Sequence, residues 1–220
     1  MLKYFACVIS VWATSALVQD SDDGFRRFIR SRLGPGQVRV YEGAGTTVIR
    51  DSHDLDCTFT KSQRCCWFNV GRGLDELDWR LANVNLTNSA LVTEFDAQYK
   101  PVGSYLIAGH PQTEDMYQAL LVSCPIVCQN GVGQLTLDHW LTQPRVRLDV
   151  CRIEMGQQEF IDCQMLTDSR TTTVDIQPHH KPFHIVFVAS GFSSPGHGNM
   201  MQSGGVVIID NVVYQSAEMC

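Results

Sequence analysis

The histidines and serines of the C-terminal third are the first candidates for chemistry. His179, His180 and His184 lie close together in the sequence, and histidine is a common zinc ligand. Their spacing matches no zinc-protease motif, so surface histidines are the better interpretation. Ser193 and Ser194 lie in a Gly-rich and Ser-rich stretch that does not match the G-x-S-x-G sequence of a hydrolase nucleophile. We therefore predict no catalytic residue, no enzyme activity and no cofactor.

Cysteine is the residue type with the strongest structural consequence. Of the nine cysteines, Cys7 falls in the apolar N-terminus and eight are left, an even number as a disulfide set requires. In an oxidising compartment such cysteines pair, whereas in the cytosol they would indicate metal binding or redox chemistry. The eight predicted to form disulfides are Cys57, Cys65, Cys66, Cys124, Cys128, Cys151, Cys163 and Cys220.

The N-terminus decides between these two compartments. Lys3 precedes an apolar run over residues 4–12, and small residues follow up to Ala16. The run is too short for a membrane-spanning helix, and the pattern is that of a secretory signal peptide. We predict a signal peptide over residues 1–16 and a secreted, extracellular protein without a membrane span; a signal anchor is the competing interpretation.

Residues 17–50 are predicted to be a basic segment or linker. Phe28, Ile29 and Leu33 recur at helical spacing among arginines, and a Gly-Pro-Gly sequence follows. This favours a short amphipathic helix. Such a helix would contact a partner or a membrane surface, pack on the domain or form a mobile arm.

Residues 51–220 have the pattern of an all-β domain. Short β-branched and aromatic runs are separated by Gly, Pro, Asn and Asp, which predicts a sandwich or barrel. Residues 146–150 alternate between apolar and polar, as in a strand with one buried face. The runs 183–189 and 206–209 are almost wholly apolar and are predicted to be central strands. Other predicted strands span residues 104–108, 117–123, 135–139, 160–166, 171–176 and 205–214.

Length and charge limit the functions further. The chain has 220 residues and a formal net charge of −6. After removal of the signal peptide it is long enough for one domain with a real core. The acidic balance argues against nucleic acid or anionic lipid as the main partner.

Ordered motifs give the chain a specific resemblance. Between residues 57 and 79 they read Cys57-Thr-Phe-Thr60, Cys65-Cys66-Trp67 and Asp75-Glu-Leu-Asp-Trp79. This order resembles the opening of a MAM domain, the adhesion module of meprins, neuropilins and the mu-type receptor tyrosine phosphatases. Later segments continue the resemblance to the end of the chain: residues 104–108, 118–122, the run ending in Trp140, 182–187, 206–211 and Cys220.

The resemblance implies a jelly-roll-like antiparallel β-sandwich that serves adhesion or recognition, with no catalytic residues. Trp67 and Trp79 are then expected to be core aromatics, because large rings near a cystine usually pack there. The family pattern also implies a disulfide between Cys57 and Cys65. It implies a second between Cys220 and one of the cysteines at 124 and 128.

The other two pairs follow from different reasoning. Cys151 and Cys163 flank a Gly-containing turn at residues 155–157, so they could face each other across a hairpin. Cys66 is then left with whichever of Cys124 and Cys128 does not bond Cys220. This fourth bridge departs from the commoner four-cysteine MAM pattern.

A metal site and a glycan attachment site complete the candidates. Some MAM relatives hold a cation with acidic side chains, but Thr60 stands where Glu is usual and Asn211 replaces the second Asp, which leaves Asp210 alone. Because calcium prefers several carboxylate oxygens, we predict no metal site. Asn85 begins the only N-x-S/T sequence and is the predicted glycosylation site.

These observations favour a secreted, non-catalytic adhesion or recognition protein of the cell surface or extracellular matrix. Its expected partner is an extracellular protein or glycan, with self-association as an open alternative. The competing function is a carbohydrate-binding jelly-roll module, which would place aromatic and polar side chains on one concave sheet face. An enzyme would need a cleft with a histidine beside a nucleophile.

Overall fold

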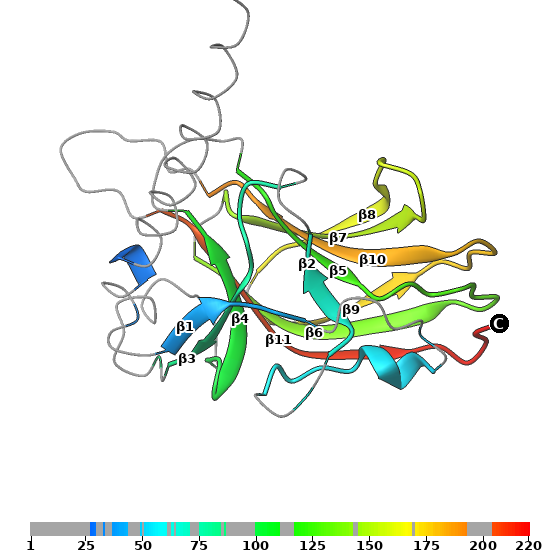
Figure 1. Ribbon diagram of the computed structural model, residues 1–220, viewed down its shortest axis with the longest axis horizontal. Helices are drawn as coiled ribbons and strands as arrows, with labels where there is room; N and C mark the ends of the chain where they lie inside the picture. The colour runs from blue at the N-terminus through cyan, green and yellow to red at the C-terminus, as the bar shows by residue number, and fades with distance from the viewer. Residues whose placement is uncertain are drawn as a thin grey trace, which may run out of the picture.

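The computed structural model is an antiparallel β-sandwich of jelly-roll type, built from two sheets (Figure 1). Within the part of the chain that the structure describes, no helix is long and apolar enough to cross a membrane. The described residues are 27–29, 33, 37–43, 49, 51–60, 63, 65–70, 75–84, 86, 100–110, 117–142, 145–168, 170–192 and 204–220.

Sheet A has six strands in the order β1-β3-β4-β11-β6-β9. All of its neighbouring strands are antiparallel. The apolar run at 206–209 lies in β11, between β4 and β6, and is central as predicted. The strands are β1 (Gln37–Val40), β3 (Arg80–Asn83), β4 (Ser104–Gly109), β11 (Val206–Gln215), β6 (Gly133–Leu141) and β9 (Arg170–Ile176).

Sheet B has five strands in the order β2-β5-β10-β7-β8. Its centre is β10, the second run that the sequence predicts to be central, paired with β5 on one side and β7 on the other. The strands are β2 (Trp67–Asn69), β5 (Ala119–Ser123), β10 (Phe183–Ser190), β7 (Arg147–Glu154) and β8 (Ile161–Leu166).

The main core lies between the two sheets. Leu135 and Leu137 of β6 face it from sheet A, and Ile185 and Phe187 of β10 face it from sheet B; all four are fully buried. Because side chains alternate along a strand, the residues between them point to the outer faces. The sandwich therefore has two outer faces, one on each sheet.

The sandwich includes residues of the segment that the sequence assigns to a linker. β1 lies before residue 51 and forms the edge of sheet A, in register with β3. Residues 27–29 and Leu33 are helical, and Ile29 and Leu33 are buried in a cluster with the outer face of sheet A. Of the alternatives for the amphipathic helix, packing on the domain is the one that these residues show; the start of the predicted helix lies outside the described residues.

Four disulfides hold the sandwich together. They join Cys57 to Cys65, Cys66 to Cys124, Cys128 to Cys220 and Cys151 to Cys163. The open choice for Cys66 is thus settled as Cys124 in the structure. The bridge to Cys220 spans 92 residues and joins the chain end to the connection after β5.

Candidate recognition surfaces

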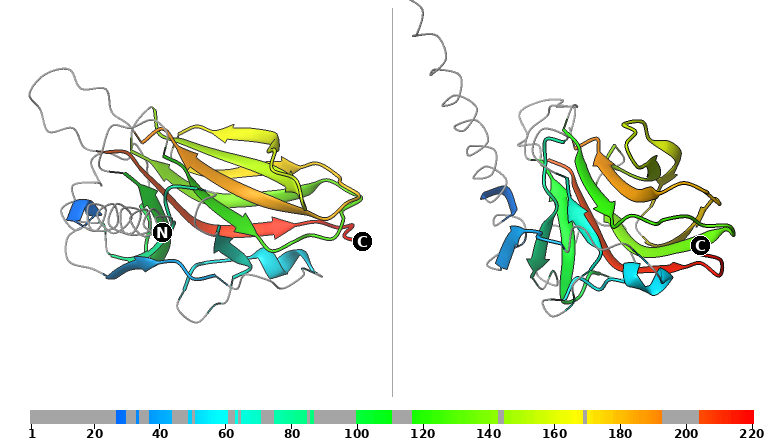
Figure 2. Two further views of the ribbon diagram at one scale, coloured as in Figure 1. Left: turned by 45° about the horizontal axis from the view of Figure 1, so that its top comes forward. Right: turned by 45° about the vertical axis from the view of Figure 1, so that its right-hand side comes forward.

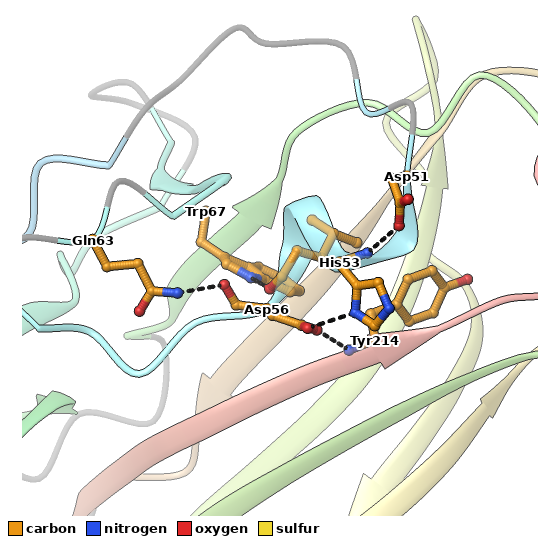
Figure 3. A network of polar contacts seen from close by, with 7 residues as sticks. Asp51, His53, Asp56, Gln63, Trp67 and Tyr214 are labelled. Atoms are coloured by element: carbon orange, nitrogen blue, oxygen red, sulfur yellow. Dashed lines mark hydrogen bonds and ion pairs between the residues drawn. The ribbon is translucent and has the colours of Figure 1, made fainter.

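The first cysteine motif is tied to β11 through a polar network (Figure 3). The 3-10 helix η1 (Ser52–Leu55) is capped by Asp51, whose carboxylate accepts a hydrogen bond from the His53 N–H at 2.9 Å. The Asp56 carboxylate accepts from the Tyr214 N–H at 2.8 Å and lies 2.9 Å from His53 Nδ1. That hydrogen bond and the charge of Asp56 raise the pKa of the exposed His53. The network continues the hydrogen bonding of β11 toward η1. The polar groups of Asp51, His53 and Asp56 therefore have a structural role.

The two tryptophans of the motifs lie in the main core. Trp67 and Trp79 are fully buried. The Trp67 ring lies 4.8 Å from that of Phe187, and its indole N–H donates to the Leu55 carbonyl at 2.9 Å. The Trp79 indole N–H donates to the Ala119 carbonyl at 3.2 Å. Because both rings fill the interior, neither contributes to a surface.

The acidic stretch before Trp79 binds the edge of β5. The Asp75 carboxylate accepts from the Leu120 N–H at 2.9 Å, and the Glu76 carboxylate accepts from the Gln118 N–H at 3.1 Å. β2 pairs with residues 121–123 of β5. Beyond the end of β2, these two carboxylates accept the hydrogen bonds that a neighbouring strand would otherwise accept. Burial raises the pKa of Asp75 to about 7.

The outer face of sheet B is the first candidate recognition surface. Its centre is an apolar cluster that includes Val186 and Val188 of β10. Among the described residues, every member of this cluster belongs to sheet B or directly follows β2. Met165 of β8 lies opposite Asp149 on the same face, and its side chain is 53% exposed. The full cluster is Phe68, Val70, Leu120, Val122, Cys151, Ile153, Val186 and Val188.

Polar groups border this apolar cluster. Arg147 lies 3.4 Å from Asp149 across one corner of the face. His184 contacts the ring of Phe68 edge to face, at 6.5 Å between ring centres, and its Nδ1 lies 2.7 Å from the Ser123 carbonyl oxygen. The strand residues of the cluster are themselves buried, Val186 at 1% and Val188 at 7% exposed, whereas Met165 and the polar groups at the border are accessible.

The outer face of sheet A is the second candidate surface, and it is polar along β6, β9 and β11. Thr136 and Thr173 hydrogen-bond across strands at 2.9 Å. Asp138 accepts from the Thr171 hydroxyl and, at 2.7 Å, from the Asn211 amide. We call these five residues the polar row. Alternation in residues 135–139 predicts one outward face, but the sequence does not single out its polar side chains as a site.

The aromatic end of the same face adjoins the polar row. Trp140 follows Asp138 on β6 with the same outward orientation, and it is paired with Ile208 of β11. Tyr105 of β4 belongs to the same cluster. Ile29 and Leu33 are buried in this cluster together with Val84 and Leu86, and Trp140 and Tyr105 are almost fully buried in it.

The three histidines considered as zinc ligands have separate surroundings. His179 Nε2 lies 3.1 Å from Glu154 Oε1, His180 is exposed, and His184 contacts Ser123. Within the described residues no three His, Cys, Asp or Glu side chains are arranged to hold a metal ion.

The residues considered for the family's cation site also have different surroundings. Thr60 is exposed and Asp210 is buried. The partners of Asp210 are the Asn211 N–H and the nearby charge of Asp138. The arrangement around Asp210 is therefore a strand-pair contact of sheet A.

Several predicted features lie outside the described residues. These are the signal peptide at 1–16 with Cys7, the glycosylation site at Asn85, and Ser193 with Ser194. Each stays a prediction.

Comparisons with known proteins find similar solved structures but no matching sequence. No family model matches the chain, and no curated protein sequence does. Among solved structures it is similar to the K1 cleaved adhesin domain of Lys-gingipain from Porphyromonas gingivalis, with a TM-score of 0.46, 12% identity, and coverage of 74% of this chain and 97% of that one. A carbohydrate-binding module specific for non-crystalline cellulose gives a TM-score of 0.42, 11% identity, and coverage of 81% and 99%.

A further similar structure belongs to a much longer chain. The enzymatically active domain of tailspike protein 4 from bacteriophage CBA120 gives a TM-score of 0.37 and 15% identity over 69% of this chain. The match spans 19% of the tailspike chain. At these scores the likeness says nothing about function, and the candidate surfaces rest on their own side chains.

Proposed function

We propose that this chain is a non-catalytic recognition domain of a secreted protein and that it binds an extracellular partner through the outer faces of its sandwich. The contrast between the two faces carries the proposal. The chain packs its own residues 29 and 33 on the apolar part of sheet A, whereas large apolar side chains stay exposed on or beside sheet B, with Met165 of β8 53% exposed. The four disulfides and the signal-like N-terminus support an oxidising, extracellular location.

The outer face of sheet B suits a protein partner. Large apolar side chains are exposed at the β7–β8 end of this sheet, with Met155 at 59%, Met165 at 53% and Phe160 at 38%. Their burial against a partner contributes roughly 25 cal/mol per Å². The strand ladder and the Cys151–Cys163 bridge fix the face before binding, which lowers the entropy lost on association. The resemblance to MAM adhesion modules supports the same role.

Cell binding by the purified protein tests this face. Met165→Glu places a charge on the exposed side chain at its rim, and we expect at least a tenfold loss of affinity, or about 1.4 kcal/mol. Val102→Glu is the matched control, because Val102 is an exposed apolar residue next to β4 of sheet A. Equal binding by both variants would exclude the outer face of sheet B.

A glycan partner is the second candidate function, and the polar row favours it. Sugar hydroxyls both donate and accept hydrogen bonds, and the row offers hydroxyl, amide and carboxylate groups on one sheet face. Neighbouring contacts already orient these groups. This is the polar half of the arrangement expected of a carbohydrate-binding jelly-roll module.

Glycan-array binding tests the second candidate. Asp138→Asn keeps the shape of the side chain and removes a charged acceptor, so we expect about a tenfold loss of glycan affinity. Glu159→Gln, in the exposed connection after β7, is the control. Periodate treatment of the target cells separates the two functions: loss of cell binding indicates a glycan partner, and unchanged binding indicates a protein.

A further inference from the structure

Two large aromatic side chains lie on the outer face of sheet A, where a sandwich domain would ordinarily meet solvent. Trp140 is 1% exposed and Tyr105 is fully buried. Trp140, Ile208 and Ile107 stand side by side across β6, β11 and β4. They form an apolar platform that is separate from the main core between the sheets.

The N-terminal helical residues cover this platform. Ile29 is 1% exposed, Leu33 is 4% exposed, and Phe28 is partly buried against the same cluster. Residues 29 and 33 are four apart, so they lie on one side of a helix. The helical ribbon, drawn in blue, lies outside the sandwich beside sheet A (Figure 2).

The size of this contact suits a cover that can open. Burial of three apolar side chains stabilises the covered state, but that gain must also offset the entropy lost on ordering their segment. Segments with few buried apolar contacts open at lower free energy than the whole domain unfolds. The main core needs no help from this segment, because its own cluster includes neither Ile29 nor Leu33.

We propose that the segment containing Phe28, Ile29 and Leu33 is an intramolecular occupant of a glycan-binding face and that its release exposes Trp140 and Tyr105. The inference rests on the glycan candidate. Aromatic rings have an apolar body that packs on the C–H groups of a sugar ring. Trp140 adjoins Asp138 along β6, so the uncovered platform would continue directly into the polar row. Together they place aromatic and polar side chains on one sheet face.

Solvent access to Trp140 tests the cover without any glycan. The test protein is the full secreted chain with Ile29→Glu and Leu33→Glu, and iodide quenching of tryptophan fluorescence is the readout. We expect stronger quenching and a red-shifted emission, with the main thermal unfolding transition retained. The same pair of changes combined with Trp140→Phe should lose the effect, because Trp67 and Trp79 stay in the main core. Val102→Glu should leave quenching unchanged.

The outcomes separate the cover from the glycan function. Unchanged quenching would overturn the proposal. So would loss of the unfolding transition in both the glutamate pair and the milder pair Ile29→Ala with Leu33→Ala, because the segment would then belong to the core. Stronger quenching should be accompanied by tighter glycan-array binding that Trp140→Phe reverses. Stronger quenching without tighter binding would overturn the glycan face and leave the cover standing.

Discussion

Asp210 of β11 lies directly opposite Asp138 of β6, and Asn211 binds both carboxylates. The Asn211 N–H donates to Asp210 at 2.8 Å, and its side-chain amide donates to Asp138 at 2.7 Å. Like charges directly opposite each other destabilise a sheet. Asn211 has a positive φ of 49° at the irregularity in the β11–β6 register, a conformation that asparagine tolerates better than most residues.

We expect this carboxylate pair to make stability depend on pH. Burial, together with the charge of Asp138, raises the pKa of Asp210 from 3.8 to about 7. Between these two values the folded protein binds more protons than the unfolded chain, so the free energy of unfolding falls as pH rises from about 4 to about 7. Asp210→Asn should raise stability at pH 7.5 by about 1–3 kcal/mol. Urea unfolding at pH 5 and pH 7.5 measures both effects.

Asp75 is a second group that makes stability depend on pH, so it limits the effect expected of Asp210→Asn. Its pKa is also raised to about 7 by burial, so the Asp210→Asn protein should keep part of the pH dependence. The prediction concerns the difference in slope between the two proteins. Equal slopes would show that Asp210 is ionised in the fold at pH 5.

The disulfides should differ in their contribution according to the loop that each closes. Cys128–Cys220 spans 92 residues and Cys151–Cys163 spans 12, for which chain entropy gives about 4.6 and about 2.8 kcal/mol. Replacing each pair by alanine should therefore destabilise the first variant more in urea unfolding. The reverse order would show that the chain end is loosely held.

Non-reducing mass spectrometry of the mature native protein should find no free thiol.

The sequence predicts the sandwich better than its surfaces. The apolar runs that become β10 and β11 predict central strands because a strand covered on both faces needs apolar residues on both. The motifs ending in Trp67 and Trp79 predict core aromatics by resemblance, and both rings are buried. β1 falls before the predicted domain start, since a four-residue edge strand leaves little periodic signal.

The candidate surfaces depend on which strands become neighbours. The polar row joins Thr136, Asp138, Thr171, Thr173 and Asn211 from three strands. The linear sequence does not specify that β11 lies between β4 and β6. The sequence likewise does not predict that Ile29 and Leu33 pack on sheet A. Their helical spacing predicts an apolar side but not the sheet face that it meets.

Asn69 takes the place of a strand partner for the Trp79 N–H, while the Trp79 carbonyl also accepts from the Tyr41 N–H at 3.0 Å. Its side chain accepts from the Trp79 N–H at 2.8 Å and donates to the carbonyls of Trp79 and Tyr41 at 3.0 and 2.9 Å. Asn69→Ala leaves these partly buried backbone groups without that partner, so we expect about 2–3 kcal/mol of destabilisation in urea unfolding. Asn83→Ala is the matched control, because among the described residues the amide of the exposed Asn83 donates to the Ser104 hydroxyl, at 3.1 Å, and to no backbone carbonyl. Its cost should be under about 1 kcal/mol. Equal losses in the two variants would mean that water replaces Asn69 and that packing of the Trp79 ring alone holds this segment against β5.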